Sequence, residues 1–180
     1  MPIGSTKSLV GTKQLRRKIM SQSFTCHDTR ITSSYRLLAS DLNEHNTVYG
    51  GHLLSILDGV ASLSASRIAP SQMVTAAVDH YDFIHPFTLN DMLTITTYVS
   101  GVGTRSLEVF AKLTGERLDT HEHFLGGTAF LTFVLLDQAA TLPAVVPQTT
   151  EERAICAGYF DRKQKQQAYR KKLPWSALEI

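Results

Sequence analysis

Hydrophobic positions along the chain follow two periods, one typical of a helix and the other typical of strands. After Gly50-Gly51, apolar residues recur every three or four positions, which is the spacing of a helix with an apolar face. They form two adjacent stripes, one of Leu53, Ile56, Val60 and Leu63 and the other of Leu54, Leu57, Ala61 and Ala65. Because the two stripes together are broader than the apolar face of a surface helix, we predict that most of this helix is buried and that it ends near residues 67–69, before Pro70.

Strand-forming segments make up most of the remaining chain. Runs rich in β-branched and aromatic residues cover positions 73–84, 92–100, 106–113 and 124–136, and a first strand is predicted at 31–39. Turn-forming residues separate the later runs, at 85–86, 90–91, 101–103 and 115–122. Long consecutive strands joined by short turns predict an antiparallel sheet. One buried helix with a long curved antiparallel sheet wrapped around it is an α+β hotdog fold.

The two ends of the chain differ from this central part. Residues 1–27 mix Gly, Ser, Thr and Lys without clear alternation, and we predict a basic N-terminal arm there. Residues 28–137 form the predicted hotdog domain, and residues 138–180 a Pro-containing linker with a charged C-terminal helix. Thr149 and Glu152, three positions apart, are typical of a capping box at the start of that helix.

Length and composition exclude several classes of protein. A chain of 180 residues, 43% of them hydrophobic, can bury the core of one domain without disulfides or a structural metal. The two cysteines, Cys26 and Cys156, lie far apart in the sequence, which fits a reducing cytoplasm. The longest apolar stretch, 129–136, is far below the roughly 18 residues that span a bilayer, and the basic N-terminus lacks the apolar segment of a secretory signal. We therefore expect a soluble, cytoplasmic protein that does not enter a membrane.

The net charge of +2 hides an uneven distribution along the chain. Residues 1–20 contribute +5, residues 21–150 contribute −6 and residues 151–180 contribute +3. An acidic centre argues against a nucleic-acid surface on the core. The basic ends are predicted to be solvated tails, although the sequence leaves open a contact with RNA, a membrane or a polyanionic ligand.

An aspartate in the middle of the predicted buried helix is the first indication of chemistry. Burying an ionised carboxylate without partners costs several kcal/mol, and Asp is a poor helix former in a helix interior. Leu54 and Ala61, four positions before and three after, place Asp58 at the edge of the apolar face. We therefore predict that Asp58 lies at a crevice; the alternative is an Asp that only caps a helix or forms a salt bridge.

The glycine pair at the start of the same helix is the second indication. Backbone amides at a helix N-terminus are unpaired and the helix dipole is positive there, so an oxyanion can be stabilised. Glycine lets a substrate carbonyl approach the backbone closely. Gly50 and Gly51 lie about two helical turns before Asp58, and an oxyanion hole with a carboxylate on one helix is typical of a thioester hydrolase. A purely structural turn is the alternative.

These segments resemble the acyl-CoA hydrolase branch of the hotdog-fold thioesterases, which includes bacterial short-chain acyl-CoA thioesterases and the brain-type and cytosolic acyl-CoA hydrolases of animals. The resemblance spans residues 28–137, and it is specific because five motifs occur in the same order. The motifs are Asp41-Leu42-Asn43 with residues 46–51, Leu57-Asp58, residues 74–79 with residues 82–86, residues 103–106, and residues 128–134.

The resemblance implies hydrolysis of acyl-CoA thioesters to a carboxylic acid and CoA. Asp58 matches the helix carboxylate that activates water or attacks the thioester carbonyl, and Gly51 matches the oxyanion-hole amide. Many relatives carry a second catalytic residue, an Asn or Asp, where this chain has Thr47. A Thr hydroxyl can position water but is not an acid or base at neutral pH. Tyr49 stands where relatives have Phe or His and is expected to line the thioester site.

The resemblance also implies contacts with the CoA part of the substrate. The residues it implies are Gly50, the strand residues Ala76, Ala77 and Val78, the residues Arg105, Ser106 and Leu107 after a turn, and Arg67 at the helix end. The backbone at 76–78 is expected to pair with the pantetheine amides. Arg105 is the expected phosphate partner, because a guanidinium group binds phosphate through two hydrogen bonds, and Arg67 is a weaker candidate. An ordinary surface charge is the alternative for both arginines.

No cofactor is expected, because CoA is part of the substrate, and no metal site is expected from His121 and His123, which lack further ligands nearby. The relatives form dimers with sites made from both chains, and three such dimers assemble together. Unpaired strand edges favour the same homo-oligomer, a trimer of dimers, for this chain.

Two other functions stay open: a non-catalytic acyl-CoA sensor, and a structural or RNA-associated protein acting through its basic ends.

Overall fold

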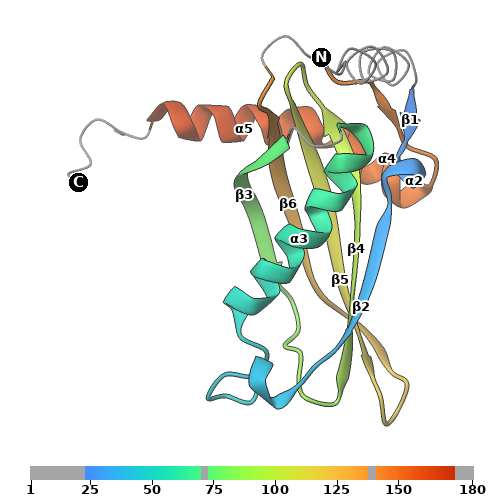
Figure 1. Cartoon of the computed structure of the whole chain (residues 1–180), viewed down its shortest axis with the longest axis vertical. Coiled ribbons are helices and arrows are strands. Elements are labelled where there is room, and N and C mark those ends of the chain that lie inside the picture. Colours follow the sequence, from blue (N-terminus) through green and yellow to red (C-terminus); the bar gives the residue numbers. More distant parts are fainter. Residues whose placement is uncertain (1–22, 70–72, 138–140, 173–180) are drawn as a thin grey trace, which may run out of the picture.

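One long helix and one antiparallel sheet form the centre of the molecule (Figure 1). A computed structural model describes residues 23–69, 73–137 and 141–172 of the chain. The elements are β1 (Phe24–Thr25), α2 (Cys26–Thr29), β2 (Ile31–Arg36), the 3-10 helix η1 (Ala39–Asp41), α3 (Gly50–Ile68), β3 (Met73–Phe83), β4 (Asp91–Val102), β5 (Ser106–Arg117), β6 (His123–Leu135), β7 (Val145–Val146), α4 (Thr150–Ala157) and α5 (Tyr159–Lys172). Among the described helices, none is long and apolar enough to cross a membrane.

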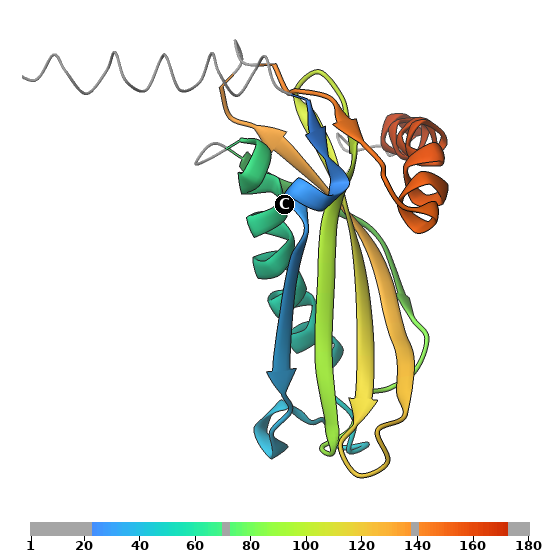
Figure 2. The same cartoon turned by 90° about the vertical axis from the view of Figure 1, so that its right-hand side faces the viewer.

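The five long strands form one sheet in the order β2-β4-β5-β6-β3, with every neighbouring pair antiparallel. The helix α3 lies on one face of this sheet, and α4 and α5 lie on the opposite face (Figure 2). β1 and β7 form a separate parallel pair, which joins the start of the described chain to the segment before α4. The predicted helix, the antiparallel sheet and the α+β class are confirmed. The described part of the predicted N-terminal arm, residues 23–27, belongs to β1 and α2, and residues 1–22 lie outside the described residues.

The first strand ends earlier than the pattern predicts. β2 stops at Arg36, and the chain turns through η1 instead of continuing to Ala39. The turn forms because the Asp41 carboxylate accepts a hydrogen bond from the Leu38 amide at 2.7 Å. The predicted strand at 31–39 is therefore wrong over its last three positions, where the chain has left the strand.

The C-terminal helix is two helices, α4 and α5, with one residue between them. The predicted capping box is confirmed, because the Thr149 and Glu152 side chains each accept a hydrogen bond from the other's amide. Salt bridges hold both helices against the sheet: Glu152 pairs with Arg30 at 2.6 Å, and Arg162 of α5 pairs with the buried Glu108 of β5 at 2.8 Å. The burial of two carboxylates is offset by these paired, hydrogen-bonded contacts.

The sheet covers only one side of α3 in a single chain. Buried positions on the helix are Leu53, Leu57, Val60, Ala61, Ser64, Ala65 and Ile68. On the other side Leu54 and Leu63 are exposed, Leu63 by 52% of its surface. Val78 and Phe83 of β3 are exposed beside them and point to the same face of the sheet as α3, as their register with Leu131 and Gly127 shows. The prediction of a mostly buried helix is therefore wrong for the isolated chain. We call the surface formed by Leu54, Leu63, Val78 and Phe83 the open α3–β3 face.

Candidate active site

The amides at the start of α3 are available to a ligand. The N-terminal cap residue of the helix is Tyr49, whose side chain makes no capping hydrogen bond. Within the described residues, no group accepts a hydrogen bond from the amide of Gly50 or Gly51. Free amides at the positive end of a 19-residue helix can stabilise a developing negative charge, so the geometry is compatible with the oxyanion role expected for Gly51.

Aromatic rings lie close to both glycines. A Cβ atom at Gly51 would lie 2.5 Å from Cε1 of the Tyr49 ring, and a Cβ atom at Gly50 would lie 3.3 Å from Cζ of Phe83. Tyr49 and Phe83 are each 62% exposed, so the two rings flank the helix start at the surface of the chain. Tyr49 therefore lies where the sequence places it, against the candidate oxyanion amide.

A cavity of about 310 Å³ lies next to this helix start. The turn residues Asn43 and Thr47, the helix residues Gly50 and Leu53, and the loop at positions 83–87 line it. Such a cavity can hold a small acyl group or part of a larger one.

The hydrogen bonds in the turn give Asn43 and Thr47 different roles. The Asn43 side-chain oxygen accepts hydrogen bonds from the Thr47 hydroxyl (3.2 Å), the Thr47 amide (3.2 Å) and the His45 amide (2.9 Å). The Thr47 hydroxyl is thus engaged within the turn. The side-chain NH₂ group of Asn43, by contrast, has no acceptor among the described residues. Asn43 is therefore the more available polar group, although the sequence comparison with the family singled out Thr47.

Asp58 lies in the middle of α3, half-buried at the edge of the open α3–β3 face. Its Oδ1 atom accepts a hydrogen bond of 2.6 Å from the Thr75 hydroxyl of β3. The position at the edge of the apolar face is the predicted one, and the cost of burial is offset by this contact and by partial exposure. Thr75 was missed as a site residue because its contact with Asp58 spans two elements.

Asp58 and Gly51 do not meet within one chain. They are separated by seven positions of an α-helix, which corresponds to roughly 10 Å along its axis. A thioester carbonyl in contact with the Gly51 amide is therefore out of reach of a water molecule held by Asp58 of the same chain. The two residues can act on one thioester only if they come from two different chains.

The residues implied for CoA lie on β3, at the start of β5 and at the end of α3. β3 is an edge strand, and its pairing with β6 skips Ala76 between Thr75 and Ala77, which leaves this stretch of backbone irregular. Ala76 and Val78 are exposed and Ala77 is half-buried, so the strand is accessible at the predicted positions. In one chain, the outer edge of β3 has no neighbouring strand among the described elements.

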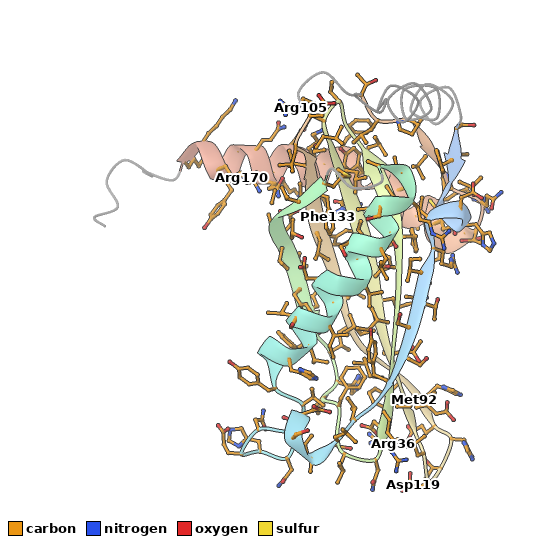
Figure 3. The ribbon with its side chains drawn as sticks, in the orientation of Figure 1. Arg36, Met92, Arg105, Asp119, Phe133 and Arg170 are labelled. Atoms are coloured by element: carbon orange, nitrogen blue, oxygen red, sulfur yellow. The ribbon has the colours of Figure 1, made fainter. Side chains whose placement is uncertain are left out.

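Arg105 lies at the end of the molecule where α3 ends (Figure 3). Its Nη2 atom donates to the Leu135 carbonyl oxygen at 3.2 Å, while its buried Nε atom has no partner among the described residues. The exposed Arg67 lies in the last turn of α3, at the same end of the molecule. The Leu107 side chain is only 1% exposed and packs in the core, so only its backbone can contact a ligand.

Comparisons with known proteins give the family. The model of the thioesterase superfamily matches residues 45–119. The uncharacterised acyl-CoA thioester hydrolase YkhA of Bacillus subtilis is 42% identical over 130 residues, which are 71% of this chain and 76% of that protein. The chain belongs to the thioesterase superfamily. It is a thioesterase with the hotdog fold, and its similarity lies with the acyl-CoA hydrolases of that superfamily.

Solved structures agree with this assignment. A hexameric acyl-CoA thioesterase superposes with a TM-score of 0.79 at 32% identity, covering 84% of this thioesterase and 99% of that chain. An acyl-CoA hydrolase from Staphylococcus aureus, solved with butyryl-CoA, CoA and CoA disulfide, superposes with a TM-score of 0.78 at 28% identity, covering 84% of this chain and 94% of that one.

Alanine variants of the Staphylococcus aureus hydrolase have been solved for three positions. They replace an Asn, an Asp 15 positions later and a Thr 17 positions after the Asp. In this thioesterase Asn43, Asp58 and Thr75 have the same residue types and the same spacings of 15 and 17 positions. The spacing therefore points to Asn43, rather than Thr47, as the counterpart of the Asn in that hydrolase.

Proposed function

We propose that this thioesterase hydrolyses acyl-CoA thioesters to a carboxylic acid and CoA at a site shared by two chains. The observation that carries the proposal is the placement of Asp58 beside Thr75, at the edge of an uncovered apolar face and about 10 Å from the free amide of Gly51. The similarity to acyl-CoA hydrolases, one of them solved with butyryl-CoA, supports the substrate class.

In the proposed mechanism Asp58 acts as a general base. Its carboxylate, held by the Thr75 hydroxyl, takes a proton from a water molecule while the water oxygen adds to the thioester carbonyl carbon. The amide of Gly51 of the partner subunit donates a hydrogen bond to the oxyanion of the tetrahedral intermediate. The carbon–sulfur bond then breaks, and the CoA thiolate receives the proton from the Asp58 carboxyl group. Asn43 of the partner subunit, whose NH₂ group is available, orients the water or the carbonyl oxygen.

For the CoA part, we propose that the nucleotide lies at the end of the molecule where α3 ends. Arg105, with Arg67 nearby in the fold, supplies positive charge for the phosphates. The pantetheine is held by the backbone of residues 76–78, which directly follow the Thr75 that contacts Asp58. Ser106 and the backbone of Leu107 lie at the start of β5, which β6 separates from β3.

We also propose that two chains pair through the open α3–β3 face and the free edge of β3. The pairing covers Leu63 and Val78, and it supplies the partner strand that the β3 edge lacks. Hexameric assembly of a solved relative supports further association of three such dimers. The native mass of the full chain, with Leu63→Glu as the disrupting variant, tests this assembly.

Subunit complementation tests the shared site. Asp58→Asn and Asn43→Ala proteins are each expected to lose most hydrolysis of a panel of acyl-CoAs, measured by thiol release. Refolded together in equal amounts, they are expected to recover roughly a quarter of wild-type activity, because half of the symmetric dimers are mixed and each mixed dimer has one intact site. No recovery, with mixed dimers present by native mass, would show that both residues act within one chain. Binding of acyl-CoA without turnover by the wild type would instead favour a sensor.

A further inference from the structure

The two cysteines of the chain lie against each other where the N-terminal and C-terminal segments meet. Cys26 is the first residue of α2 and Cys156 lies in the last turn of α4, 130 positions later, yet their Sγ atoms are 3.6 Å apart. The thiols therefore connect α2 with α4, two short helices from segments far apart in the sequence. The sequence contains only these two cysteines, and the proposed thioesterase mechanism uses neither.

Packing on both sides holds the two thiols in this position. Cys26 is fully buried in a cluster with Tyr98 and other aromatic side chains, and Cys156 packs against the same cluster. The salt bridge between Arg30 and Glu152 joins the same two segments, four residues after Cys26 and four residues before Cys156. Because this bridge lies about one helical turn from the thiols, the short distance between the Sγ atoms is fixed by the fold rather than by one mobile side chain.

The two thiols differ in accessibility and in acidity. Cys156 is partly exposed, whereas Cys26 is sealed from solvent. The hydrogen bond between the two thiols lowers the pKa of Cys156, and the same contact together with burial raises the pKa of Cys26. Since the thiolate is the nucleophile in thiol chemistry, the accessible Cys156 is the group that reacts first.

We propose that Cys26 and Cys156 are a reversible modification site, at which a low-molecular-weight disulfide converts the two thiols into an intramolecular disulfide between α2 and α4. The Cys156 thiolate attacks the small disulfide, forms a mixed disulfide and releases one small thiol. Cys26 then loses its proton as its sulfur attacks the Cys156 sulfur, and a second small thiol leaves. Two protein thiols are oxidised and one small disulfide is reduced to two thiols. The sulfur atoms must approach by about 1.5 Å to reach bonding distance.

The bond would fasten the C-terminal helices to the body of the protein. It closes a loop of about 130 residues, which constrains the unfolded chain strongly. α4 and α5 lie on the face of the sheet opposite α3, so the bond forms away from Asp58 (Figure 2). The oxidised protein is therefore expected to be more resistant to heat while its hydrolytic rate is unchanged.

Equilibration of the full chain with mixtures of reduced and oxidised glutathione tests the proposal. Oxidation is expected to reduce the mass of the monomer by the two thiol hydrogens and to leave no titratable thiol. Unfolding is expected to shift upward by roughly 5–10 °C, and dithiothreitol is expected to reverse all three changes. The Cys26→Ser variant serves as a trap, since it should accumulate glutathione on Cys156. The Cys156→Ser variant should remain unmodified, because its remaining thiol is buried.

Three results would overturn the proposal. Two free thiols that persist in fully oxidised glutathione would show that Cys156 does not react in the folded protein. A stable glutathione adduct on the wild type would show that Cys26 cannot reach Cys156. A disulfide between two chains, seen as a covalent dimer, would show that the exposed thiol pairs elsewhere. Each measurement is made on the wild-type protein, so none depends on whether a variant folds or on the proposed hydrolysis.

Discussion

The contact between Thr75 and Asp58 gives the sharpest test of how the proposed base is positioned. Replacement of Thr75 by Val removes the hydroxyl that donates to the Asp58 carboxylate at 2.6 Å and keeps the β-branched shape that suits strand β3. A hydrogen bond to a charged group contributes about 1.5–3 kcal/mol, which corresponds to about 10–150-fold in rate if it is fully used in the transition state. Asp58 is half-exposed and water can replace part of the contact, so a loss of roughly tenfold in kcat is expected.

The assay is steady-state thiol release from one acyl-CoA, with KM and kcat measured separately. The Thr75→Ser variant is the matched control, because it keeps the hydroxyl and should retain most of the rate. The melting temperature of all variants should stay close to that of the wild type, since Thr75 lies on an exposed stretch of an edge strand. A Thr75→Val protein with kcat within twofold of the wild type would refute the positioning role. A change confined to KM would assign Thr75 to substrate binding instead.

Four further predictions concern individual positions. Gly51→Ala should lower the rate of hydrolysis about a hundredfold or more, because the added Cβ displaces the Tyr49 ring into the path of the thioester carbonyl. The loss of stability should be small, since that ring is exposed. Activity equal to that of the wild type would refute the oxyanion role. Arg105→Ala should raise the dissociation constant of CoA roughly tenfold, measured by calorimetry, with Arg105→Lys recovering part of the affinity; an unchanged constant would remove Arg105 from the phosphate site. Leu107→Ala should lower the melting temperature by roughly 5–15 °C, since its side chain fills the core; a loss of CoA affinity at constant stability would contradict this. Burial alone would raise the pKa of Glu152, but hydrogen bonds from backbone amides and from Arg30 outweigh burial and hold this pKa below the usual 4.5. The free energy of unfolding, measured in urea, should therefore fall as the pH drops below 4.5. The Glu152→Gln variant should show a smaller fall over the same pH range.

Helices and strands whose hydrophobic period and flanking turn residues lie within one segment could be predicted from the sequence. The helix α3 has a continuous apolar period bounded by two glycines and a proline, and its bounds of Gly50–Ile68 agree with the prediction. The four later strands begin within one residue of the predicted positions, because turn-forming residues mark their starts. The capping box of α4 was recognisable because both of its residues lie within one turn.

Contacts between elements could not be predicted in this way. The partner of Asp58 is Thr75, which lies on the next strand and has no periodic relation to the helix. The contact between Cys26 and Cys156 joins segments 130 positions apart, and their spacing alone suggested no pairing. Asn43 was visible in the motif, but only the hydrogen bonds in the turn show that Thr47 is engaged while the Asn43 NH₂ group is available.

The burial of α3 shows why the sequence pattern describes an assembly better than it describes one chain. The apolar stripes of this helix indicate burial on two sides, whereas the sheet of its own chain covers only one, and Leu63 is left 52% exposed. Selection acts on the helix in its final surroundings, so residues that face a partner are as apolar as residues that face the core. The same reasoning accounts for Asp58. A carboxylate at the edge of an apolar face is poorly accommodated in a fully enclosed helix and of little use on a freely solvated one. At the proposed boundary between two chains it would be desolvated only when the partner, with its own Gly51 amide, is in place, so assembly would complete the proposed site.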